Sequence, residues 1–148
     1  MSRPIMHSLV TALGRVPGFD LLDEDMLLRI VGASVNLFWA AGSFVFRKDS
    51  PGDALYVVLA GEVRVTGDGM EKSIEPGDYF GEMSLLRHST HTKDVEAVKD
   101  SELLVLPADS FRRLLAASPD LMTLIQKRLR QREHEFDRVE TEAPRKVM

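Results

Sequence analysis

The chain has 148 residues, a formal net charge of −4 and no cysteine. Its length suits one domain with a single core, and 44% hydrophobic against 28% charged residues is ordinary for a soluble globular protein. The missing cysteines exclude a disulfide scaffold, a thiolate zinc site and a cysteine nucleophile. The acidic balance argues against broad electrostatic attraction to nucleic acid or anionic lipid.

The first residues of the chain, Met1 to His7, lack the apolar run of a signal peptide. No uninterrupted apolar segment approaches the roughly 18 residues that a membrane helix needs. We therefore expect a cytoplasmic protein with no membrane segment in this chain, either as a whole protein or as a piece of a longer one.

Two short helices are predicted at the start of the chain. Apolar residues recur at helical spacing between residues 6 and 16, and Pro17-Gly18 ends this helix. A second helix over residues 22–31 has Asp23 as its expected N-cap.

From residue 34 to residue 106 short runs of β-branched and aromatic residues alternate with glycine turns. This spacing is typical of a β-sandwich or barrel. The candidate strands are residues 35–40, 44–47, 55–59, 62–66, 71–74, 95–98 and 103–106, together with a β-type stretch that ends at Phe80.

Beyond Pro107 the pattern is helical again. Asp109 is the expected cap of a helix that ends near Ser118, and a second helix begins at Pro119 and reaches to Val139. The seven-residue step from Leu129 to Phe136 allows a homodimer seam along this last helix.

These patterns predict one domain over residues 6–140. Its expected parts are a helical entry (6–33), a β-roll (34–106) and C-terminal helices (108–140), and residues 141–148 are expected to be a disordered tail.

The segment from Phe80 to Leu86 points most directly to a ligand. Gly81 lets the backbone turn tightly, and residues 82–86 can then form one turn of helix. Unpaired N–H groups at the start of a helix favour an anion, whereas an ionised Glu82 can only accept hydrogen bonds. A phosphate joined to a sugar satisfies both, because it brings an anion and hydroxyl donors.

This segment, Phe80-Gly81-Glu82-Met83-Ser84-Leu85-Leu86, resembles the phosphate-binding cassette of cyclic nucleotide-binding domains. That family includes catabolite activator proteins, protein kinase A regulatory subunits and nucleotide-gated channels. The stretch from Asp53 to Val63 and the glycines between the predicted strands also resemble the family. The resemblance implies a fold that is mainly β with flanking α, namely an eight-stranded jelly roll (double-stranded β-helix) with N-terminal helices and two C-terminal helices.

The resemblance also implies a ligand, cyclic AMP or cyclic GMP. Glu82 would bind the ribose 2′-hydroxyl, and backbone N–H groups of the short helix would hold the phosphate. In the family an arginine nine residues after the glutamate pairs with the phosphate, and here that position is His91. Imidazole cannot form the two parallel charge-assisted bonds of a guanidinium. Loss of the arginine's bonds to the phosphate, worth about 1.5–3 kcal/mol, weakens the binding of the nucleotide by roughly one to two decades.

Three alternatives remain for the position of His91. The imidazole binds the phosphate itself, more strongly when it is protonated. A second alternative is that Arg87 or Lys93 supplies the missing cation. The third is a degenerate fold that no longer binds a cyclic nucleotide and acts as a protein-interaction module or binds another anion, such as a cyclic dinucleotide.

The candidate ligand-binding residues come from the cassette, from the residues that follow it, from one strand and from the last helix. The Thr92 hydroxyl would touch the base or the phosphate, and Val63 and Val65 would either wall the base pocket or pack in the core. The full set is Phe80, Gly81, Glu82, Met83, Ser84, Leu85, Arg87, His91, Thr92, Lys93, Val63, Val65 and Arg128.

The sequence shows no catalytic or metal-binding pattern. His88 and His91 are three residues apart, but their loop setting and the lack of cysteine do not predict a metal. No nucleophile elbow or Ser–His–Asp spacing occurs either. We therefore expect a regulatory domain that is not an enzyme and carries no cofactor.

In such a domain the bound ligand would shift the last helix, and this shift would be relayed to an effector protein or a fused output module. Direct DNA binding is not expected, because the chain is acidic and no helix-turn-helix follows the last helix.

Overall fold

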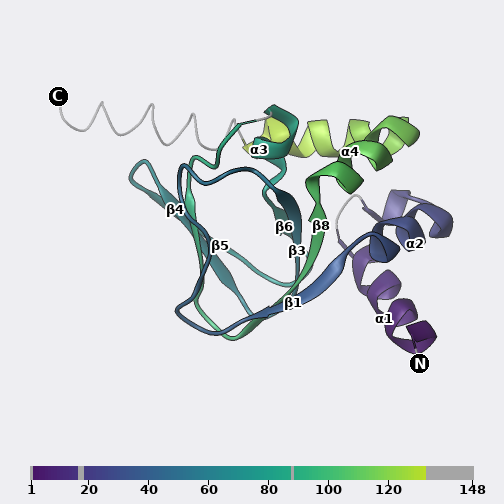
Figure 1. The fold of residues 1–148 in the computed structure, drawn as a ribbon, viewed down its shortest axis with the longest axis horizontal. Helices are drawn as coiled ribbons and strands as arrows, with labels where there is room; N and C mark the ends of the chain where they lie inside the picture. The colour runs from purple at the N-terminus through teal and green to yellow at the C-terminus, as the bar shows by residue number, and fades with distance from the viewer. Residues whose placement is uncertain (1, 17–18, 88, 133–148) are drawn as a thin grey trace.

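The computed structural model describes residues 2–16, 19–87 and 89–132. Two layers of strands form a roll, and helices gather on one side of it (Figure 1). The strands are β1 (Val35–Trp39), β2 (Phe44–Phe46), β3 (Ala54–Ala60), β4 (Val63–Gly67), β5 (Met70–Ile74), β6 (Tyr79–Phe80), β7 (Asp94–Ala97) and β8 (Ser101–Pro107). The helices are α1 (Ser2–Gly14), η1 (Phe19–Leu21), α2 (Glu24–Gly32), α3 (Glu82–Arg87) and α4 (Ala108–Ala117). Residues 119–132 are also helical and are called the C-terminal helix below.

The described residues form two four-stranded sheets. One has the strand order β1-β8-β3-β6 and the other β2-β7-β4-β5, and the paired strands are antiparallel. The fold class predicted from the sequence, mainly β with flanking α, is confirmed. The predicted strand runs overlap the observed strands, and the β-type stretch that ends at Phe80 is β6.

Strand β3 is buried on both faces and joins the two halves of the core. Leu55 and Val57 pack with the helices, whereas Tyr56 and Val58 belong to the cluster between the sheets. Successive side chains of a strand point to opposite faces, so one short apolar run serves both clusters. The helices are thereby fixed against the outer face of the β1-β8-β3-β6 sheet.

Short polar side chains cap two of the described helices. Asp23 caps α2 as predicted, because its Oδ1 accepts a hydrogen bond from Met26 N at 2.8 Å. The prediction that Asp109 caps α4 is wrong: Pro107 holds the N-cap position, and Asp109 lies inside the first turn. Ser118 instead caps the C-terminal helix, since its Oγ accepts from Leu121 N at 3.1 Å.

The C-terminal helix runs from the end of α4 toward α3 and brings residues 128–132 near the cassette (Figure 1). Among the described residues no helix is both long and apolar enough to cross a membrane. The predicted tail (141–148), Pro17-Gly18 and the predicted seam residue Phe136 lie outside the described residues.

Candidate functional site

A cavity of about 70 Å³ lies between the cassette, the β2-β7-β4-β5 sheet and the end of the C-terminal helix. Its walls are mostly apolar, with four charged side chains among them. The lining residues are Phe46, Val65, Lys72, Ile74, Phe80, Gly81, Glu82, Met83, Ser84, His91, Thr92, Lys93, Val95 and Arg132.

Two glycines allow the cassette to pack tightly against the start of β3. Gly81 has φ +95°, and a Cβ there would lie 2.8 Å from the carbonyl oxygen of Ala54. A Cβ on Gly52 would lie 2.5 Å from Ser84 Cβ and 2.8 Å from the carbonyl oxygen of Ser89. Only glycine fits these positions without a shift of the backbone, and α3 is therefore held beside the cavity.

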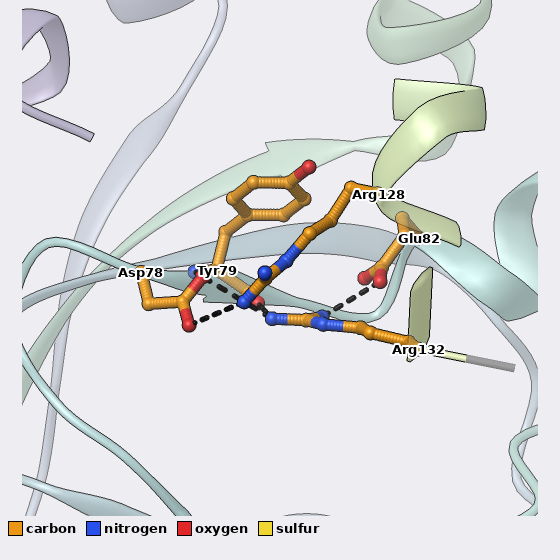
Figure 2. A network of polar contacts seen from close by, with 5 residues as sticks. All are labelled: Asp78, Tyr79, Glu82, Arg128 and Arg132. Atoms are coloured by element: carbon orange, nitrogen blue, oxygen red, sulfur yellow. Dashed lines mark hydrogen bonds and ion pairs between the residues drawn. The ribbon is translucent and has the colours of Figure 1, made fainter. Parts of the chain in front are cut away.

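Glu82 lines the cavity, is buried and is bound by an arginine of the C-terminal helix (Figure 2). Arg132 Nη1 donates to Glu82 Oε1 at 2.6 Å, and the two side chains are 8% and 2% exposed. Arg132 Nη2 donates to Asp78 Oδ1 at 3.2 Å and to the carbonyl oxygen of Tyr79. Figure 2 shows the guanidinium lying between the two carboxylates.

A second arginine of the same helix completes this network. Arg128 Nη2 donates to Asp78 Oδ2 at 2.8 Å, so Asp78 receives one bond from each arginine. The pair is less buried than the Glu82 pair, with side chains 29% and 30% exposed. Two carboxylates of the β6–α3 region thus face two guanidiniums, which ties the C-terminal helix to the cassette.

His91 borders the same cavity on the side of the β2-β7-β4-β5 sheet. Its ring stacks on Phe46 with centroids 3.5 Å apart and planes within 5°, and its Nδ1 lies 2.9 Å from Ser84 Oγ. The main chain is fixed as well, because His91 N donates to the carbonyl oxygen of Ser50 and its own carbonyl accepts from Asp49 N. His91 Nε2 is buried and has no hydrogen-bond partner among the described residues.

The burial of His91 sets its charge. Loss of contact with water lowers the pKa of His91 below its usual value, and the nearby Asp53 carboxylate opposes this shift. The imidazole is therefore neutral near pH 7 in the ligand-free chain. The family resemblance implies an arginine, which is a permanent cation, at position 91. This chain has a neutral imidazole there.

The structure brings most of the predicted site residues together around this cavity. Those that line it are Val65, Phe80, Gly81, Glu82, Met83, Ser84, His91, Thr92 and Lys93. Their contact with a ligand stays a prediction.

Four predicted site residues do not line the cavity. Leu85 and Val63 are buried in the core clusters, and Arg87 is exposed at the end of α3. Arg128 is paired with Asp78 and lines a separate cavity of about 620 Å³ beside η1.

The remaining cavity residues were not predicted. Lys72 and Ile74 come from β5, Phe46 and Val95 from the sheet, and Arg132 from the C-terminal helix. The basic run from Lys127 to Arg132 was the available signal for the last of these. Which of its side chains reaches Glu82 depends on the rotation of the helix about its axis, which the run does not reveal.

Cations other than Arg132 also reach the cavity. Lys93, proposed above as a substitute for the arginine, has its Nζ 2.6 Å from Asp68 Oδ2. Lys72 on β5 also lines the cavity. Among the described residues no group of three His, Asp or Glu side chains is placed to hold a metal ion, and His88 lies outside that part of the chain.

Comparison with known proteins agrees with this geometry. Residues 37–118 match the family model described as "Cyclic nucleotide-binding domain". The chain is 32% identical over 131 residues to cGMP-dependent protein kinase, isozyme 1, of Drosophila melanogaster, which is 82% of this chain and 17% of that protein. It is 32% identical over 113 residues to the cAMP-dependent protein kinase regulatory subunit of Emericella nidulans, which is 74% of this chain and 27% of that protein.

A solved structure shows the same fold. The regulatory domain of Toxoplasma gondii PKA with cAMP matches with a TM-score of 0.75 at 23% identity, over 88% of this chain and 50% of that one. The chain spans 17% and 27% of the length of the two curated relatives above. With the family model matched over residues 37–118, the chain belongs to the cyclic nucleotide-binding domain family.

Proposed function

We propose that the chain is a non-enzymatic regulatory module that binds cyclic AMP or cyclic GMP in the cavity beside α3. The observation that carries this proposal is the buried Glu82 carboxylate at the cavity wall. An ionised carboxylate can only accept hydrogen bonds, so it selects a ligand that brings hydroxyl donors. Both curated relatives described above are named for a cyclic nucleotide, which supports this class of ligand.

The size of the cavity indicates how binding would be relayed. Its volume of about 70 Å³ is well below the roughly 300–1,000 Å³ of ordinary small-molecule sites. A nucleotide therefore needs the wall to move, and Arg132 is the wall residue that bonds Glu82. A ribose hydroxyl at Glu82 would compete with Arg132 and shift the C-terminal helix, and this shift would reach an effector protein or a fused output module.

Calorimetric titration with cyclic AMP and with cyclic GMP tests the proposal. We expect binding to the unmodified chain and an affinity that is about 10- to 100-fold weaker in Glu82→Ala, because bonds to a charged acceptor contribute about 1.5–3 kcal/mol. Glu75→Ala is the matched control, since Glu75 is exposed and does not line the cavity. No heat with either ligand, together with unchanged melting at high ligand concentration, would contradict the proposal.

The neutral His91 favours a second candidate, a degenerate domain that no longer binds cyclic AMP or cyclic GMP. Such a domain would act as a protein-interaction module or bind a different anion, such as a cyclic dinucleotide. A third titration with a cyclic dinucleotide separates the two. Heat in that arm alone supports the second candidate. Homodimerisation through the C-terminal helix, the lack of DNA contact and a cytoplasmic location remain predictions.

A further inference from the structure

Two contacts hold the ring of His91, and they occupy only one of its two nitrogens. Phe46 stacks on the ring at 3.5 Å, and Ser84 Oγ lies 2.9 Å from Nδ1. The remaining nitrogen, Nε2, has no hydrogen-bond partner among the described residues, although His91 is 2% exposed and lines the cavity. A buried polar atom without a partner is costly, and a ligand in this cavity would provide one.

Ser84 can satisfy Nδ1 in either charge state of the imidazole. Its hydroxyl lies 2.9 Å from His91 Nδ1 and 3.4 Å from the carbonyl oxygen of Thr90. In the neutral ring with the proton on Nε2, the hydroxyl donates to Nδ1. In the imidazolium, Nδ1–H donates to the hydroxyl, and the hydroxyl turns to the Thr90 carbonyl. The ring can thus gain a proton without moving its neighbours.

The charged groups that face the His91 side of the site are the four charged residues that line the cavity and Asp53, which acts on the ring through its charge. They are Asp53 before β3, Lys72 on β5, Glu82 on α3, Lys93 before β7 and Arg132 on the C-terminal helix. Most of these charged groups already have a partner. Glu82 pairs with Arg132, and Lys93 pairs with Asp68. Asp53 accepts a hydrogen bond from the Tyr56 hydroxyl. A ligand phosphate would add an anion beside the imidazole, and an adjacent anion favours the protonated ring.

We propose that His91 Nε2–H donates to the phosphate of the bound cyclic nucleotide and that the imidazole takes up one proton from solvent as the ligand binds. This inference rests on the function proposed above and names the phosphate contact of that site. No covalent bond of the ligand changes, because the proton comes from water or buffer and goes to Nδ1. Binding and proton uptake are then linked, and each strengthens the other.

The test is calorimetric titration of cyclic AMP and cyclic GMP between about pH 5.5 and pH 8.5, in two buffers of different ionisation enthalpy. We expect the affinity to rise as the pH falls, by up to about tenfold per pH unit, and to level off at the acidic end. The measured heat should differ between the buffers and report uptake of up to one proton per ligand.

Three variants separate the contact from a general effect of pH. His91→Gln keeps an N–H donor that does not titrate, so its affinity should be independent of pH and its heat independent of buffer. His91→Arg restores a permanent cation, so its affinity should be higher and also independent of pH. Ser84→Ala removes the partner of Nδ1, so its pH dependence should persist with a midpoint at lower pH.

The outcomes distinguish this inference from the proposed function. Binding to the unmodified chain without pH dependence and without proton uptake overturns the inference alone. The inference is also overturned if His91→Arg binds a cyclic nucleotide and the unmodified chain binds none at any pH. In that case the pocket still has the shape of a nucleotide site. Failure of both proteins to bind at any pH overturns the proposed function, and the inference with it.

Discussion

Arg132 Nη1 and Glu82 Oε1 lie 2.6 Å apart although the two residues are 50 positions apart in the chain. Both side chains are almost fully buried. The same guanidinium binds Asp78 and the carbonyl of Tyr79, so one residue of the C-terminal helix contacts both β6 and α3. The helix is therefore part of the site wall, and under the proposed function a ligand that changes the partners of Glu82 would act directly on the helix.

Removal of this arginine should destabilise the fold strongly. Arg132→Ala leaves the Glu82 carboxylate buried without its partner, and breaking a buried ion pair in this way costs about 3–5 kcal/mol. Urea unfolding followed by circular dichroism measures the change. Arg128→Ala is the matched control: its pair with Asp78 is about one-third exposed, and exposed pairs contribute about 1 kcal/mol or less. Similar losses in the two variants would show that the Glu82 pair has no special role.

The close approach of Gly52 to α3 gives a second prediction. A Cβ at Gly52 would lie 2.5 Å from Ser84 Cβ, so Gly52→Ala should displace α3 and cost about 1–3 kcal/mol, as overpacking does. The control is Gly32→Ala at the end of α2, where a Cβ meets nothing within 4 Å. Alanine there should be neutral or stabilise by up to about 1 kcal/mol. Thermal melting of both variants checks this, and equal melting temperatures would contradict it.

The sequence predicts the parts of the site that depend on short-range order. Gly81 and Glu82 belong to one tight turn, and the continuous apolar run of β3 predicts a strand that is buried on both faces, so a short window contains the information. Arg132 depends on where a separate helix docks, and the Phe46–His91 stack depends on how β2 lies against the segment before β7. Such contacts arise from packing between distant segments, which local patterns do not encode. The wrong cap prediction at Asp109 concerns a helix boundary: the N-cap of α4 is Pro107, two residues before the predicted one.

Ser118 should control how firmly the C-terminal helix is anchored. Its Oγ accepts from Leu121 N at 3.1 Å, and loss of an N-cap bond costs about 0.5–2 kcal/mol. Ser118→Ala should therefore lower the free energy of unfolding and raise hydrogen exchange in the first turn of this helix. Ser110→Ala in the first turn of α4 is the control and should change stability little, because this half-buried serine caps no helix and accepts a solvent-exposed bond from Arg113. Unchanged exchange near Leu121 in Ser118→Ala would contradict this role.

The buried imidazole should also give the ligand-free chain a pH-dependent stability. The folded pKa of His91 is lowered by burial from its ordinary value of 6.5, so between these two values the unfolded chain binds more protons than the folded one. The free energy of unfolding therefore falls as the pH drops through about 6.5 and levels off below the folded pKa, with a slope of at most about 1.4 kcal/mol per pH unit.

His91→Gln isolates this effect, because it removes the buried imidazole and leaves every other titratable residue of the chain in place. Urea unfolding between about pH 5 and pH 8 should show a smaller slope for the variant than for the unmodified chain. The two proteins should differ by a constant amount above about pH 7, where the imidazole is neutral in both states. If the free energies of unfolding of the two proteins ran parallel across the whole pH range, His91 would not be buried as a neutral ring. Acid would then not be expected to lower the stability of the ligand-free chain while raising its affinity for the nucleotide.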